Sequence, residues 1–434
     1  SDVEDLYIEK FNPTNPNQYE FLGKWEEAQV YREEIKVKGR PEPVLEEVRV
    51  TRHGPILTTL NTSAQNGDST QPVELPLALR WTGLEHNDIV SALEKMALAT
   101  DIHEFRNALR HWDVPAQNFV FADTNGEIGY VMAGAIPTRA KGQALLPMPG
   151  WTGEYEWTGL IPFEELPQVI NPPQHFIVTA NNRVVGDSYP YYITHEWLNG
   201  YRAQRIRDLL LKKGKLALSD MAAIQGDQYS IPAEHITPHI LSLPPRTLLA
   251  SQAQEILRTW HYVLAPDSAA AAIYTTFLRK LEHLVFAVQL GDDEGLLKSY
   301  LGTGTTLLAI ANGYTSRSKP FIIRMLNERD ESWFADSVLP NGPRNWEAAL
   351  HRAFEAALDE LREKLGDDPF AWQYGKIHSM TYAHVLGMVK PLDKVFNRGP
   401  YPVGGDIDTV NMGAVSPTQP ENVITVPSFR QIAN

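Results

Sequence analysis

The sequence contains no cysteine among its 434 residues. That absence excludes disulfide bonds, a cysteine nucleophile and zinc held by thiolates. The sequence also lacks any apolar run approaching the ~18–20 residues of a membrane-spanning helix, so we expect no membrane as a partner. The opening residues, SDVED, do not show the basic and then apolar pattern of a secretion signal. None of these absences decides the cellular compartment.

Basic residues are in the minority, with 39 Lys and Arg against 53 Asp and Glu, and the formal net charge is −14. Proteins that bind nucleic acid normally carry a basic footprint, so we expect no nucleic acid as a partner. The hydrophobic content of 43% is ordinary for a globular protein. Because single cores stop growing near ~250–300 residues, the chain should form two lobes or one extended multilayer body.

The first part of the chain, residues 1–195, has the pattern of a β-rich body. Predicted strands lie at 44–51, 75–81, 118–122 and 128–135. The last two flank Asp123-Thr124-Asn125-Gly126, and Asn-Gly between apolar runs predicts a hairpin because both residues tolerate positive φ. Two short helices are also expected, one at 88–98 and one that starts at an Asp101 N-cap.

Near Tyr201 the apolar residues begin to recur at helical spacing, which predicts a mainly helical lobe over residues 196–395. Its predicted helices include 253–264, 268–290 and 346–365. Residues 396–434 are again rich in Gly and Pro and include a strand-like run at 423–426, which indicates a return to the β-rich body. The expected fold class is therefore mixed α/β, one layered body with an inserted helical lobe.

Short strings stand in a fixed order along nearly the whole chain. They are DVEDLY (2–7), TRHGPIL (51–57), QNF (117–119) leading into AD (122–123) and GY (129–130), LPMPG (146–150), WTG (157–159), ANN (180–182), YR (201–202), NRG (397–399) and PSFRQ (427–431). In this order they resemble the penicillin acylase family, a branch of the N-terminal nucleophile hydrolases. Each string alone is weak, and the resemblance rests on their succession.

The resemblance implies a layered αββα core of the N-terminal nucleophile hydrolase type, incomplete in this chain. It also implies an enzyme made by autoproteolysis of a precursor, which frees an N-terminal serine. The serine's own α-amino group acts as the general base, which is sound chemistry because such a group titrates near ~7.7–8.0. The implied substrates are linear non-peptide amides, such as a penicillin, an acyl-homoserine lactone or a related N-acyl compound, and relatives are often periplasmic or secreted.

Ser1 is not expected to be that nucleophile. In the family the nucleophile opens a strand well upstream of the string that begins here at Asp2. We therefore interpret the chain as an internal piece of the large (beta) chain, inactive alone. Its expected partners are the small (alpha) chain and the start of the large chain. The alternatives are a truncated scaffold or binding fragment without turnover and a metal-dependent hydrolase.

Two residues are catalytic candidates by the resemblance. Asn181 matches an asparagine whose side-chain amide stabilises the tetrahedral oxyanion, and Arg202 matches an arginine near the nucleophile's amine and the substrate. A fixed neutral N–H donor suits the first role, and a fixed cation can keep an amine neutral or bind a carboxylate. The alternatives are an Asx-turn pair at 181–182 and a solvated helix residue at 202.

The opening string also matches a segment that supplies calcium ligands in some members of the family. By that match Asp2 and Asp5 would bind through side chains, and Glu4 and Ala144 through backbone carbonyls. Such oxygen ligands suit calcium, which would be structural. A further family aspartate has no clean counterpart here, since Tyr191-Tyr192-Ile193 stands near its place and only Asp187 is close. The alternative is a solvated acidic segment.

Gln117 matches a position that lines the acyl pocket, where an amide would make the pocket more polar than an aliphatic residue. The alternative is a buried glutamine bonded to a neighbouring strand. The histidines His53, His378 and His384 do not fall in a metal-binding frame such as HExxH, so we expect structural roles for them.

Overall fold

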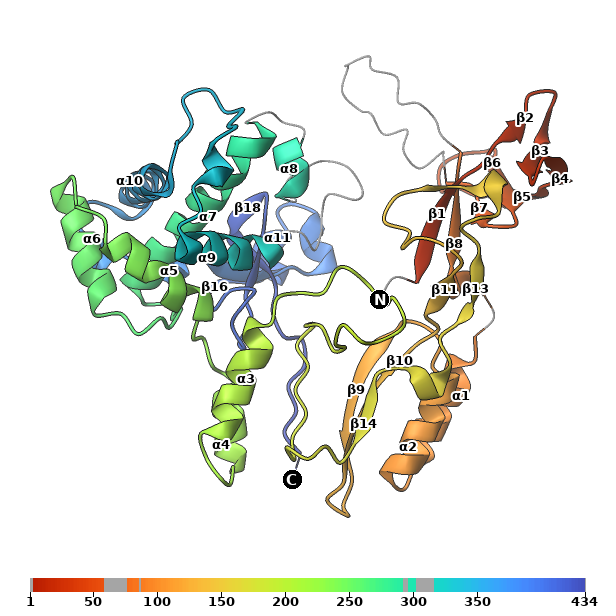
Figure 1. The fold of residues 1–434 in the computed structure, drawn as a ribbon, viewed down its shortest axis with the longest axis horizontal. Coiled ribbons are helices and arrows are strands. Elements are labelled where there is room, and N and C mark those ends of the chain that lie inside the picture. Colours follow the sequence, from red (N-terminus) through yellow and green to blue (C-terminus); the bar gives the residue numbers. More distant parts are fainter. Residues whose placement is uncertain (1–2, 58–75, 86, 292–295, 302–315, 434) are drawn as a thin grey trace. The chain divides into compact units, whose positions relative to one another are not determined.

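The computed structural model describes residues 3–57, 76–85, 87–291, 296–301 and 316–433, and Figure 1 shows its elements in chain order. It divides into two compact units. The first unit comprises Ser1–Ile177 and Val184–His195, and the second comprises Val178–Arg183 and Glu196–Asn434. The sequence analysis divided the chain after residue 195, and the structure adds the short segment 178–183 to the second unit. Residues 396–434 also belong to that second unit.

The first unit is built mainly from strands that pair into small sheets. They are β1 (Glu4–Ile8), β2 (Phe11–Asn12), β3 (Asn15–Phe21), β4 (Lys24–Glu27), β5 (Gln29–Ile35), β6 (Val44–Thr51), β7 (Gly54–Pro55), β8 (Leu77–Trp81), β9 (Gln117–Ala122), β10 (Ile128–Ala133), β11 (Pro137–Arg139), β12 (Met148–Pro149), β13 (Trp157–Leu160) and β14 (Gln168–Ile170). Strand β1 lies at the centre of one sheet, between antiparallel β8 and parallel β12.

The predicted hairpin forms between β9 and β10, with Ile128 opposite Ala122. Asp123 closes the turn, because its carboxylate accepts hydrogen bonds from the backbone N–H groups of Asn125 and Glu127. Helices α1 (Ile89–Leu98) and α2 (Ile102–Ala108) lie beside this hairpin in Figure 1. The expected Asp101 N-cap is present, and its side chain accepts from two N–H groups of the first turn of α2.

The second unit carries most of the helices. They are α3 (Tyr201–Leu211), α4 (Leu218–Gln225), α5 (Ile231–Leu241), α6 (Leu248–Arg258), α7 (Ala269–Leu290), α8 (Leu296–Tyr300), α9 (Ser318–Glu328), α10 (Trp346–Leu365) and α11 (Asp393–Phe396). The long helices α7 and α10 pack against each other and supply much of one continuous apolar core. Within it the Phe277 and Phe354 rings meet edge to face with centroids 6.2 Å apart.

The helix predicted at 253–264 is misplaced, since α6 runs from Leu248 to Arg258. Thr247 fixes its start, because its side chain accepts a hydrogen bond from the backbone N–H of Ala250. After Arg258 the chain turns, and Tyr262 takes a left-handed φ of 60° that no helix interior allows.

The second unit also contains a small mixed sheet. Its strands are β16 (Arg398–Pro402), β15 (Ser379–Tyr382), β18 (Gln419–Thr425) and β17 (Ala414–Ser416), in this spatial order. The mixed α/β class expected from the sequence is thus confirmed. Among the described residues, no helix is both long enough and apolar enough to cross a membrane.

Candidate active site

Asn181 lies on the short segment 178–183 of the second unit. Its backbone has a φ of 62°, a left-handed conformation that asparagine tolerates better than most residues. Its carbonyl oxygen accepts a hydrogen bond of 3.0 Å from the N–H of Leu198. The local turn contact is made by Asn182, whose Oδ1 accepts from the N–H of Ala180 at 3.0 Å. The exposed Asn181 side chain is therefore not used to form the turn.

Arg202, in the first turn of α3, fixes the orientation of the Asn181 amide. Its Nη2 donates to Oδ1 of Asn181 and to the carbonyl oxygen of Ala180, both at 2.9 Å. A guanidinium can only donate, so the amide must turn its oxygen toward Arg202 and its NH2 group away. The two catalytic candidates of the sequence analysis thus lie in contact, with the amide donor held in one direction.

The positive charge of Arg202 lies beside the Asn181 amide. Burial lowers the pKa of the Arg202 guanidinium, and the carboxylates of Asp408 and Asp406 act in the opposite direction. Because a guanidinium titrates far above neutral pH, Arg202 remains charged. A neutral N–H donor backed by a fixed cation can stabilise an oxyanion without reorganising as charge develops.

A buried ion cluster holds the start of α3, which carries Arg202. Asn199 donates from Nδ2 to Oδ1 of Asp408 at 2.7 Å and accepts from the N–H of Tyr201 at 3.2 Å. Lys319 on α9 forms ion pairs with Asp408 and, at 3.1 Å, with Asp406. Burial alone would lower the pKa of Lys319, but the nearby acidic groups, Asp406 and Asp408 first and then Glu282, outweigh it and raise the pKa.

Sequence analysis missed this cluster. Lys319 and Asp408 are 89 positions apart, and no local pattern links them. The weak signal was a lysine beside apolar Phe321 and Ile322 in a helix, and an Asp-Ile-Asp run within a Gly-rich stretch. Only the fold shows that these charges are buried together.

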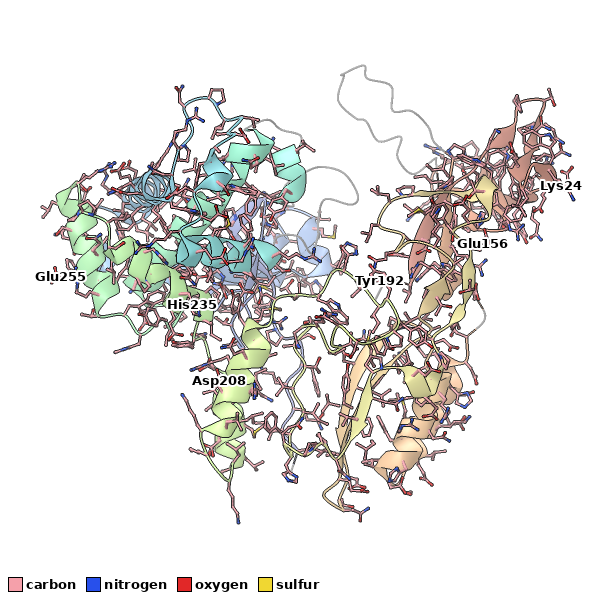
Figure 2. The ribbon with its side chains drawn as sticks, viewed as in Figure 1. Lys24, Glu156, Tyr192, Asp208, His235 and Glu255 are labelled. Atoms are coloured by element: carbon pink, nitrogen blue, oxygen red, sulfur yellow. The ribbon has the colours of Figure 1, made fainter. Side chains whose placement is uncertain are left out.

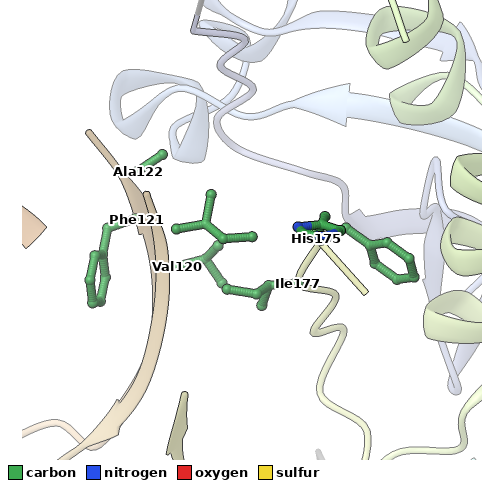
Figure 3. A pocket seen from close by; sticks show the side chains of 7 residues that line it. Val120, Phe121, Ala122, His175 and Ile177 are labelled. Atoms are coloured by element: carbon green, nitrogen blue, oxygen red, sulfur yellow. The ribbon is translucent and has the colours of Figure 1, made fainter. Parts of the chain in front are cut away.

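Gln117 is the first residue of β9 and is exposed. Side chains alternate along a strand, so Gln117 shares a face with Phe119 and Phe121, opposite Val120. A mainly apolar pocket of about 300 Å³, shown in Figure 3, is lined by Val120, Phe121, Ala122, Ile128, His175, Phe176 and Ile177. Gln117 does not line this pocket, and its role in an acyl pocket stays a prediction.

The residues expected to bind calcium occupy different settings. Asp2 lies outside the described residues. Glu4 is the exposed first residue of β1, and Ala144 lies in the loop between β11 and β12 with a left-handed φ of 51°. Asp5 is buried and its carboxylate faces arginine and tryptophan donors. No cluster of three or more acidic or histidine side chains able to hold a metal occurs among the described residues.

These described residues do not fit a calcium site. Calcium needs six to eight oxygen ligands, whereas both carboxylate oxygens of Asp5 already accept hydrogen bonds from the cation Arg139. A calcium ion at Asp5 would therefore have to displace Arg139.

His53 lies buried between two glutamates of the first unit. Its Nδ1 is 2.8 Å from Glu9 and its Nε2 is 2.7 Å from Glu156, which Figure 2 labels. The ring stacks on Tyr7 with centroids 4.0 Å apart. Burial would lower the His53 pKa, but the hydrogen bonds that the ring makes to the carboxylates of Glu156 and Glu9, together with their negative charges, outweigh it and raise the pKa. This environment fits the structural role expected from the sequence.

Comparison with known proteins identifies the family of this chain. The family model described as penicillin amidase matches residues 1–434. The chain is 30% identical to the acyl-homoserine lactone acylase QuiP of Pseudomonas fluorescens, over 100% of the chain and 52% of that protein. It is also 30% identical to the penicillin acylase 2 proenzyme of Pseudomonas sp. strain SE83, over 96% of the chain and 50% of that protein. The chain thus spans about half the length of these curated relatives.

A solved structure supports the same assignment at the level of the fold. The thermostable penicillin G acylase from Alcaligenes faecalis matches with a TM-score of 0.64 at 21% identity, covering 86% of this chain and 67% of that one. Together with the family match over the whole chain, this likeness leaves one conclusion. The chain belongs to the penicillin amidase family.

Proposed function

We propose that the complete protein containing this chain hydrolyses linear non-peptide amides, such as penicillins, N-acyl-homoserine lactones or related N-acyl compounds. The names of the relatives, an acyl-homoserine lactone acylase and a penicillin acylase proenzyme, support this substrate class. The observation that carries the proposal is the Asn181 amide, whose oxygen Arg202 holds so that its N–H donor faces away.

The proposed nucleophile is an N-terminal serine supplied from outside residues 1–434. Its hydroxyl oxygen attacks the amide carbon while its own α-amino group takes the proton. The Asn181 N–H stabilises the negative oxygen of the tetrahedral intermediate. The carbon–nitrogen bond then breaks, the amine leaves with the proton, and water hydrolyses the acyl ester to release the acid and the free serine.

The proposal also names partners for this chain. The relatives are about twice as long as the chain, and one is named a proenzyme. We infer that the small (alpha) chain and the start of the large chain supply the rest of the site. Because Asn181 and Arg202 both lie in the second unit, this unit contributes the oxyanion donor and its orienting cation.

Substitution of Asn181 in the complete protein tests the proposal. Asn181→Asp is nearly isosteric and keeps an acceptor for Arg202, but it removes the N–H donor. We expect kcat for a chromogenic N-acyl amide to fall by ~10²–10³, with little change in KM, because the donor acts on the transition state. Asn341→Ala is the matched control, since Asn341 is also an exposed asparagine with a left-handed φ of 57° in the second unit.

The outcomes separate the two parts of the proposal. A near-normal kcat for Asn181→Asp would mean that the Asn181 amide does not stabilise the oxyanion, although the protein is still an amidase. An absence of turnover by the wild-type complete protein across a panel of N-acyl amides would contradict the amidase function itself and favour a binding or scaffold role.

A further inference from the structure

The buried carboxylate of Asp5 forms an ion pair with the buried guanidinium of Arg139. The Asp5 side chain is 2% exposed, and its partner Arg139 is 4% exposed. Arg139 donates from Nε to Oδ2 at 2.8 Å and from Nη2 to Oδ1 at 2.6 Å, a parallel two-bond arrangement. The indole Nε1 of Trp157 donates to Oδ2 at 2.7 Å. All three contacts lie within the first unit.

The strands explain why this ion pair forms. Asp5 is on β1, while Arg139 and Trp157 pair with each other across β11 and β13. Burying an ionised carboxylate without a partner is very costly, so β1 can enter the core only with a cation beside it. Arg139 supplies a positive charge directly beside the carboxylate of Asp5.

Two further residues make the surroundings unsuitable for a second cation. Tyr192, labelled in Figure 2, presents its ring to the Arg139 guanidinium at 5.9 Å. By the family resemblance it stands near the place of an aspartate, and Asp187 is the only aspartate close to that place in the sequence. Arg80, opposite Asp5 on β8, stacks over Trp157 at 4.9 Å. A divalent ion at Asp5 would meet two guanidinium groups nearby.

We propose that the Arg139 guanidinium takes the structural place that the family resemblance assigns to calcium, so that this protein is stabilised at Asp5 without a metal. The bidentate pair ties β1 to β11, and Trp157 ties the same carboxylate to β13. This inference does not depend on the amidase proposal, because it concerns only the stability of the first unit.

Thermal unfolding of the complete protein tests the inference. The wild type is measured with EDTA and with millimolar calcium chloride, and we expect its midpoint to change by less than about 1 °C. A calcium site at 100 times its Kd would raise the midpoint by roughly 5–10 °C. The midpoint of Arg139→Met should fall by roughly 6–20 °C, since it leaves a buried charge unpaired. Arg32→Met, on an arginine that is 83% exposed, is the matched control and should change little.

A double variant keeps the test decisive if Arg139→Met fails to fold. Asp5→Asn combined with Arg139→Met removes both charges and should be more stable than Arg139→Met alone. A wild-type midpoint that rises with calcium and falls with EDTA would overturn the proposal. So would an Arg139→Met variant as stable as Arg32→Met, because the ion pair would then contribute nothing.

Discussion

Replacement of Lys319 by methionine removes the cation from the buried cluster at the start of α3. Methionine keeps an unbranched apolar side chain of similar length, so the change is mainly one of charge. The side chains of Lys319 and Asp408 are only 11% and 4% exposed, so little water can compensate. Breaking a buried ion pair by removing one partner costs ~3–5 kcal/mol.

That loss can be measured as a change in the thermal midpoint. In a unit of ~150–250 residues each kcal/mol moves the midpoint by ~2–4 °C, so we expect Lys319→Met to lower it by roughly 6–20 °C. Lys364→Met is the control, because Lys364 is 35% exposed, its partner Glu421 is 50% exposed, and its other partner, Glu360, keeps ion pairs with Arg279 and Lys280. Such exposed pairs contribute ~1 kcal/mol or less.

A second variant checks the assignment of the effect to the charge. Asp408→Asn combined with Lys319→Met should lose less stability than the two single changes added together, since the residues interact directly. If Lys319→Met unfolds at the same temperature as Lys364→Met, the buried cluster does not stabilise the unit and the reasoning is refuted.

Two further predictions concern the first unit. The His53 pKa is raised in the folded state, so the contribution of His53 to stability is fully present below the unfolded pKa of ~6.5 and is lost as pH rises through the folded pKa. The difference in thermal midpoint between wild type and His53→Gln should therefore shrink from pH 6 to pH 9. A difference that stays constant over this range would contradict the prediction. Gly54→Ala should destabilise the folded protein by at least ~1–3 kcal/mol, because Gly54 has a φ of 114° and an added Cβ would collide with the Leu79 carbonyl. Gly186→Ala is the control, since a Cβ at Gly186 has open space, and it should be nearly neutral in the same melting assay.

Sequence predicted those features whose causes lie within a few residues. The 123–126 turn formed because Asp123 bonds N–H groups two and four positions away. The helix expected at 268–290 is present as α7, and Ser268 caps it through the N–H of Ala271. The α6 boundary was wrong because the chain turns at Tyr262, whose ring packs on Trp260 with centroids 5.5 Å apart, a contact with no periodic signal.

The candidate site also combines features that the sequence indicated with features that only the fold shows. Asn181 and Arg202 are candidates through the family resemblance, and only the fold shows that Arg202 holds the amide oxygen. Asp5 in an acidic string is typical of a metal ligand, and its partner Arg139 is 134 positions away. Pairing over such distances depends on strand register and burial, which one sequence does not reveal.

Trapping the acyl-enzyme tests the central claim most directly. The complete protein is mixed with an activated N-acyl substrate, quenched in acid, digested and examined by mass spectrometry for the peptide that carries the acyl group. We predict the added acyl mass on an N-terminal serine of a peptide outside residues 1–434, and its loss when that serine is replaced by alanine. An acyl group on Ser1, or turnover without any acyl-peptide under conditions where acylation is faster than hydrolysis, would contradict the account.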